Sequence, residues 1–238
     1  MKIQILSMPR TGSSYLKTML NFQMTKYVNY FTISEPFNDS KQSLIKYQNR
    51  NTIINSIKSS DNALVKSHIH ELINIQHTDV FKEYSAIDWY TICLLRRNIF
   101  TLTLSRVIAI STGVWDNQNF KNLIMHIDFE IFKNYLIQTL NWIRFIKLNS
   151  FNFIFHKVVF YEDLLFKSES DLNNIGIPVT HTTYYAPSRL YLKRDIISNY
   201  NELYQNTIEF TRGIQDLSFD GVYLQDNIIF NNNSTLNI

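Results

Sequence analysis

The sequence predicts an α/β protein with a central parallel sheet flanked by helices. Short apolar segments of strand character recur along the chain, and stretches with helical spacing or helix-start signals separate them. The first of these segments runs through a glycine-containing turn into a helix-compatible stretch. Alternation of this kind is typical of parallel sheets whose strands are connected by helices.

Seven segments define the expected elements. The strand-like segments are residues 2–7, 63–66, 89–95 and 153–160. Residues 40–59 are polar and predict an exposed helix, whereas residues 98–111 are apolar on nearly all sides and predict a buried helix. Residues 128–150 carry apolar side chains three or four positions apart, which indicates one face of a long amphipathic helix.

Length and composition predict a single domain. The chain has 238 residues, of which 45% are hydrophobic and 14% are aromatic, and this is enough to form a sizeable core. No internal repeat, linker or charge block divides it, so we expect one domain over residues 1–238, with a loosely ordered tail at about 226–238. Cys93 is the only cysteine, and its apolar surroundings predict a buried, inert thiol.

The charge pattern narrows the class of partner. The net charge of +3 comes from 23 basic and 20 acidic residues spread along the chain. This balance is compatible with a small anionic ligand, and the lack of a concentrated basic stripe argues against nucleic-acid binding. No apolar stretch is long enough to span a membrane, and the first residues lack an apolar leader. We therefore expect a soluble, cytoplasmic protein.

The first candidate site follows the first strand. Its sequence is Met8-Pro9-Arg10-Thr11-Gly12-Ser13-Ser14. A strand, a turn with glycine and a helix start direct backbone N–H groups at one point, which makes a P-loop-like anion site. Arg10 adds a fixed positive charge, and Thr11, Ser13 and Ser14 add hydroxyls, although the two serines could instead simply cap the helix.

This segment resembles the 5'-phosphosulfate loop of sulfotransferases that use 3'-phosphoadenosine 5'-phosphosulfate (PAPS). In that family a basic residue, a glycine and two hydroxyl residues follow a proline, as Arg10, Gly12, Ser13 and Ser14 follow Pro9 here. The segment has one glycine and no lysine before its hydroxyl residues, so it differs from the loop that binds Mg-nucleoside triphosphates.

Three further segments extend the resemblance. Arg97 and Ser105 have the eight-residue spacing of the family's 3'-phosphate ligands, which implies that they bind that phosphate. The stretch from Thr112 to Trp115 is similar to a T-G-x-W element of trehalose sulfotransferase-type bacterial enzymes. Basic residues of a late family segment approach the nucleotide, which implies a binding role for Arg194, although a solvated charge is the simpler interpretation.

Two elements offer different general bases. Glu35-Pro36 resembles the E-P element of carbohydrate-type sulfotransferases, in which the glutamate is the proposed base, and Lys66-Ser67-His68 resembles the K-T-H element of cytosolic sulfotransferases, in which the histidine has that role. We expect Glu35 to be the primary base and His68 an auxiliary. Because Pro36 disfavours helical backbone at the preceding residue, we also expect Glu35 to be extended.

The resemblance implies a sulfotransferase that moves a sulfuryl group from PAPS to an acceptor hydroxyl, with a carbohydrate as the favoured acceptor and 3',5'-bisphosphoadenosine (PAP) as the product. Arg10 would stabilise the leaving phosphate, and no metal is expected, because the histidines lack a ligand set at familiar spacing. Two alternatives remain open. One is a module that binds PAP without turnover, and the other is a small-molecule kinase of the P-loop type.

Overall fold

The computed structural model describes residues 1–25, 30–38, 50–115, 124–148, 153–166, 196–212, 214, 218–219 and 222–223. The chain divides into two compact units. The first, which we call the sheet unit, comprises Met1–Leu95 and Trp142–Tyr184. The second, the helical unit, comprises Arg96–Asn141 and Tyr185–Ile238.

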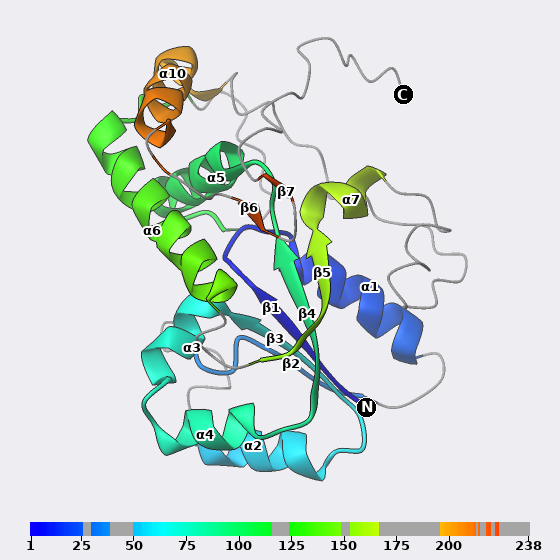
Figure 1. Cartoon of the computed structure of the whole chain (residues 1–238). Coiled ribbons are helices and arrows are strands. Elements are labelled where there is room, and N and C mark those ends of the chain that lie inside the picture. The colour runs from blue at the N-terminus through cyan, green and yellow to red at the C-terminus, as the bar shows by residue number, and fades with distance from the viewer. Residues whose placement is uncertain are drawn as a thin grey trace. The chain divides into compact units, whose positions relative to one another are not determined.

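A five-stranded parallel sheet forms the centre of the sheet unit (Figure 1). Its strands are β1 (Lys2–Ser7), β2 (Phe31–Ser34), β3 (Ala63–His68), β4 (Trp89–Leu95) and β5 (Phe155–Phe160). They lie in the order β2-β3-β1-β4-β5, and every neighbouring pair is parallel. The α/β class with a central parallel sheet is thereby confirmed.

Helices α1 (Ser13–Thr25) and α7 (Tyr161–Phe166) cover one face of this sheet. Alternate residues of a strand point to the same face, so β1 presents Ile3 and Ile5 to these helices. The described core on this face includes a buried cluster of Ile3, Ile5, Leu16, Leu20, Leu64, Ile92, Leu94, Val159 and Leu164. Removal of these side chains from water provides the main force that docks α1 on the sheet.

The opposite face contains a buried polar network around Tyr84. This residue belongs to α4 (Asp79–Ser85), and its hydroxyl contacts Gln4 Nε2 at 3.0 Å and Ser67 Oγ at 3.1 Å. Burial raises the pKa of the Tyr84 hydroxyl, so it stays neutral and bridges β1 and β3. Cys93 is fully buried in β4, and burial raises the pKa of its thiol, as an inert core residue requires.

Two short helices complete the sheet unit. Helix α2 (Arg50–Ser59) buries Ile53, Ile54 and Ile57, so the expectation of an exposed helix is wrong for this face of it, and residues 39–49 lie outside the described residues. The isoleucines are three and four positions apart and form an apolar stripe that the polar neighbours obscure in the sequence. Helix α3 (Ile69–Ile75) follows β3 directly.

Three helices form most of the described helical unit. They are α5 (Ile99–Thr112), α6 (Phe129–Lys147), whose last turns belong to the sheet unit, and α10 (Tyr200–Thr211). The ring of Phe100 in α5 packs against those of Phe132, Tyr200 and Tyr204, with ring centroids 5.3 to 5.4 Å apart. The prediction of a buried helix over 98–111 is confirmed, and the predicted amphipathic helix over 128–150 is α6. A two-stranded antiparallel pair, β6 (Ser218–Phe219) and β7 (Val222–Tyr223), completes this unit.

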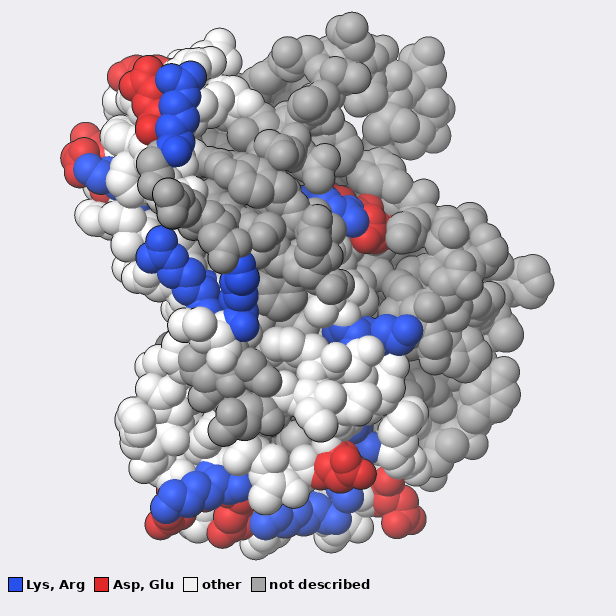
Figure 2. All heavy atoms as spheres, viewed as in Figure 1, with Lys and Arg blue, Asp and Glu red and all other residues white. Residues whose placement is uncertain are grey.

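Charged side chains on the described surface are mixed in sign. Figure 2 shows acidic and basic groups interspersed in the part of the view where α2 and α4 lie in Figure 1. Lys58 pairs with Glu83 at 3.0 Å, and Lys82 pairs with Asp79 at 2.8 Å. Among the described residues, no helix combines the length and the apolar character that crossing a membrane requires.

Candidate anion site at the carboxyl edge of the sheet

The strand order creates a topological switch point at the carboxyl ends of β1 and β4. In the strand order, the connection that leaves β1 leads toward the edge formed by β2, whereas the connection that leaves β4 leads toward the opposite edge, formed by β5. Ligands of open α/β sheets bind where neighbouring connections diverge in this way, just beyond the carboxyl ends of the strands. The loop between β1 and α1 lies at this edge, and together with the first turn of α1 it contains the residues predicted to bind an anion.

The loop between β1 and α1 has two residues with left-handed backbone. Arg10 has φ 68° and Gly12 has φ 81°. For an arginine this conformation is strained, and such strain concentrates at functional sites. Ser13 begins α1, and the buried Thr11 donates its hydroxyl hydrogen to the carbonyl of Met8 at 2.7 Å, inside the loop.

Gly12 is required by its contact with Tyr161. A Cβ atom at position 12 would lie 2.2 and 2.4 Å from two ring carbons of Tyr161, the first residue of α7. Tyr161 opens the segment Tyr161-Glu162-Asp163-Leu164, which stands where β5 passes into α7 and places two acidic residues in the first turn of that helix. The ring of Tyr161 therefore fixes the position of the loop against the end of β5.

Lys66 joins the loop to the candidate base. Its ammonium lies 2.6 Å from Oε1 of Glu35 and donates to the hydroxyl of Ser14 at 3.1 Å. Lys66 is in β3 and points to the same face as α1, because it stands two residues before His68 and opposite Ile5 of β1. Both partners of the ion pair are at least nine-tenths buried.

His68 lies between Ser7 and Glu35. Its Nδ1 is 3.1 Å from Ser7 Oγ, and its Nε2 is 3.3 Å from Glu35 Oε1. A neutral ring with its proton on Nε2 satisfies both contacts, since Nδ1 then accepts from the serine hydroxyl. Ser7 and His68 are register partners in the parallel pairing of β1 with β3, so the sheet itself sets this contact.

The backbone at Glu35 corrects one expectation. Its φ is 54°, so the extended conformation expected from Pro36 is wrong. The carbonyl and the Oε2 of Glu35 both accept hydrogen bonds from Asn38, at 3.2 and 3.0 Å, and its backbone N donates to Lys66. These bonds outweigh the local effect of the proline and direct the side chain toward Lys66 and His68.

Glu71 also lies beside this group. Glu35, His68 and Glu71 each offer a metal-ligand atom, and within the described part of the chain these three atoms lie within 4.8 Å of one another. Glu71 caps the N-terminus of α3, because its carboxylate accepts a hydrogen bond from the backbone N of His68 at 3.4 Å. Lys66 supplies a positive charge to the group, and the expectation that no metal is needed stays a prediction.

The ring of His68 continues into an aromatic stack. The rings of His68 and His70 stack with centroids 5.7 Å apart, and those of His70 and Trp142 stack with centroids 5.5 Å apart. Trp142 comes from the last turns of α6, within the sheet unit. The stack holds His68 in one orientation, which preserves its contacts with Ser7 and Glu35.

The predicted ligands of the 3'-phosphate lie in the helical unit. Arg97 stands two residues after the end of β4, and Ser105 is buried in α5. Trp115 of the T-G-x-W element is exposed and follows Gly113, which ends α5 in left-handed backbone. Arg194 and the tail at about 226–238 lie outside the described residues.

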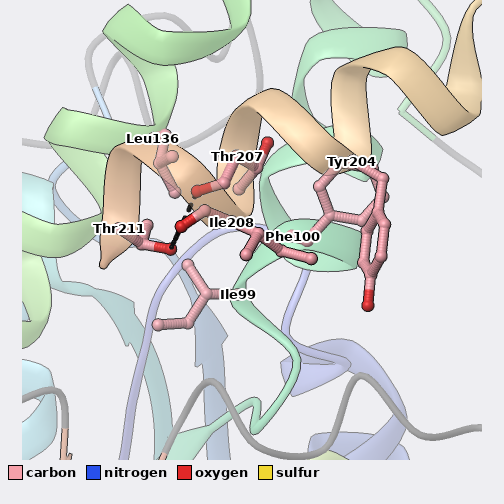
Figure 3. A pocket seen from close by; sticks show the side chains of 7 residues that line it. All are labelled: Ile99, Phe100, Leu136, Tyr204, Thr207, Ile208 and Thr211. Atoms are coloured by element: carbon pink, nitrogen blue, oxygen red, sulfur yellow. Dashed lines mark hydrogen bonds between the residues drawn. The ribbon is translucent and has the colours of Figure 1, made fainter.

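A small apolar hollow of the helical unit was not anticipated from the sequence. Figure 3 shows it among α5, α6 and α10, and it is lined by Ile99, Phe100, Leu136, Tyr204, Thr207, Ile208 and Thr211. The hydroxyls of Thr207 and Thr211 donate to backbone carbonyls of their own helix. Its volume of ≈ 10 Å³ is about that of a single water position, so it is a packing defect.

Four side chains of the candidate site, Ser7, Asn38, Lys66 and Glu71, have no role predicted from the sequence. The sequence predicts Ser7 only as the end of a strand and Lys66 only as part of the K-S-H element. The spacing of Lys66 and His68, two residues apart on one strand face, is the signal that could have paired them.

No protein-family model matches this chain, and no curated protein is significantly similar to it.

Replacement of Gly12 by alanine should destabilise the protein by about 3 kcal/mol, because the new Cβ meets the Tyr161 ring and the left-handed backbone becomes strained. Gly113→Ala is the matched control, since Gly113 has φ 70° but nothing within 4 Å of an added Cβ. That variant should lose only about 1 kcal/mol. Urea unfolding measures both, and equal losses would contradict the Tyr161 contact.

Proposed function

We propose that the chain is a sulfotransferase that moves a sulfuryl group from PAPS to an acceptor hydroxyl. The observation that carries the proposal is the position of Lys66, whose ammonium bridges the Ser14 hydroxyl of the phosphate loop and the carboxylate of Glu35. An anion-binding loop and a carboxylate base are the two parts that this reaction needs. In this protein one buried lysine contacts both.

The chemistry follows from these groups. Glu35 takes the proton of the acceptor hydroxyl, the acceptor oxygen attacks sulfur, and the bond from sulfur to the 5'-phosphate oxygen breaks with its electron pair on the phosphate. Arg10, Lys66 and the amides at the start of α1 stabilise the charge that develops on this leaving group. Both His68 nitrogens already face Ser7 and Glu35, so we assign His68 an auxiliary role, as a donor that holds Glu35.

The acceptor and the surroundings of the enzyme are part of the proposal. A carbohydrate hydroxyl is the preferred acceptor, on the resemblance of Glu35-Pro36 and of the segment from Thr112 to Trp115 to carbohydrate-type enzymes. Arg97 and Ser105 would bind the 3'-phosphate of PAPS, and Arg194 would contact the nucleotide. We further propose a cytoplasmic location, where PAPS is a soluble cofactor, with no nucleic-acid partner and no metal.

PAP should stabilise the protein in the absence of magnesium. At about 100-fold excess over Kd, binding to the native state alone contributes about 2.7 kcal/mol, which corresponds to a rise in Tm of about 5 to 10 °C. Arg97→Ala should lose most of this rise. A protein that responds to Mg-ATP and not to PAP would be a kinase instead, and an unchanged PAP response in folded Arg97→Ala would refute the 3'-phosphate assignment.

Turnover with labelled PAPS distinguishes the two candidate bases. Glu35→Gln should lower kcat by about 10² or more, since it removes the proton acceptor while preserving shape. His68→Asn should lower kcat less, because it removes only a hydrogen-bond donor to Glu35. Each variant is first checked for PAP binding. Retention of more than about a tenth of the activity by Glu35→Gln, with an inactive His68→Asn, would make the histidine the base.

A further inference from the structure

Both carboxylate oxygens of Glu35 are engaged. Oε1 accepts from Lys66 at 2.6 Å and faces His68 Nε2 at 3.3 Å, and Oε2 accepts from Asn38 at 3.0 Å. A carboxylate oxygen has two lone pairs, so two partners occupy the acceptor positions of Oε1. A hydroxyl that is to give its proton to this oxygen must first replace one of them.

Lys66 is the partner that can be displaced. His68 is held on its other side by Ser7. The backbones of Asn38 and Lys66 are both hydrogen-bonded to that of Glu35, but the short side chain of Asn38 keeps its amide beside the carboxylate. Lys66 instead ends in a compact ammonium on a flexible stem, and it already contacts Ser14 in the first turn of α1. An anion bound at that turn would offer this ammonium a negative oxygen in competition with Glu35.

We propose that Lys66 couples donor binding to the availability of Glu35. The proposal rests on the sulfotransferase function proposed above. With the donor absent, Lys66 occupies the position on Glu35 that the acceptor hydroxyl needs. The bound donor draws the ammonium to its phosphosulfate group, Glu35 Oε1 becomes accessible, and the acceptor binds second. Oε1 of Glu35 therefore has no acceptor position available for the hydroxyl until the donor is bound.

Linkage makes this coupling measurable without an acceptor. If donor and Glu35 compete for one ammonium, then removing the charge of Glu35 must strengthen anion binding, and only while Lys66 is present. Simple repulsion between Glu35 and an anion would also be relieved by such a change, but independently of Lys66. A double-mutant cycle separates these two causes.

The experiment is calorimetric titration of PAP into the wild type, Glu35→Gln, Lys66→Met and the double variant. Glu35→Gln should lower Kd about tenfold, the size of a modest coupling between close charges. In the Lys66→Met background the same change should leave Kd unaltered within about twofold. Glu83→Gln is the matched control, because it breaks the exposed Lys58–Glu83 pair and should not change Kd.

Other outcomes overturn the proposal in distinguishable ways. Weaker or equal PAP binding by Glu35→Gln, or equal tightening with and without Lys66, would overturn the coupling and leave the sulfotransferase function standing. Failure of the wild type to bind PAP would overturn both. If Glu35→Gln does not fold, NMR of the lysine ammonium groups of the wild type tests the coupling instead. The Lys66 signal is identified by its loss in Lys66→Met. PAP should shift this signal, and an unchanged Lys66 signal in the PAP complex overturns the coupling.

Discussion

The parallel register of β3 with its two neighbours is the constraint on which the candidate site depends. It sets His68 beside Ser7 of β1 and Lys66 beside Ser34 of β2, all on the face that α1 covers. One strand therefore carries a lysine and a histidine, two residues apart, to the edge where the loop between β1 and α1 begins. A shift of one residue in this register would turn both side chains to the face of Tyr84.

The buried ion pair is costly for stability, and this cost is informative. Removal of two charges from water is repaid only when the geometry is good and the remaining polar groups are bonded. Here Ser14, His68 and Asn38 supply such bonds to Lys66 and Glu35. Apolar side chains of similar volume often stabilise a fold as well as a buried ion pair does. The presence of a lysine and a glutamate at these positions therefore supports a chemical role for them.

The sequence was most informative where the signal is local. Apolar runs located β1 and β4, and helical spacing located α5 and α6, because burial on both sides or on one stripe leaves a periodic pattern. The edge strand β2 was missed, since only Ile33 of its four residues is buried. The contact of Gly12 with Tyr161 joins residues far apart in the sequence, and only the packing of β5 beside β4 brings them together.

The same distinction applies to the candidate site. The loop from Met8 to Ser14 was predicted because a strand, a glycine turn and a helix start are adjacent in sequence. Glu35 and His68 were predicted separately as alternative bases, and the structure places them 3.3 Å apart in one hydrogen-bonded group. That group depends on strand pairing and on the left-handed backbone of Glu35. Neither the backbone propensity of glutamate nor the following proline predicts this conformation.

A crystal structure of the protein with PAP bound tests the central claim most directly. We expect the 5'-phosphate at the start of α1, within hydrogen-bond distance of Ser14 Oγ and of the Lys66 ammonium, about 2.7 to 3.2 Å. We also expect Lys66 to lie farther from Glu35 Oε1 than its present 2.6 Å. A phosphate bound elsewhere, with the Lys66–Glu35 pair intact, would contradict the account.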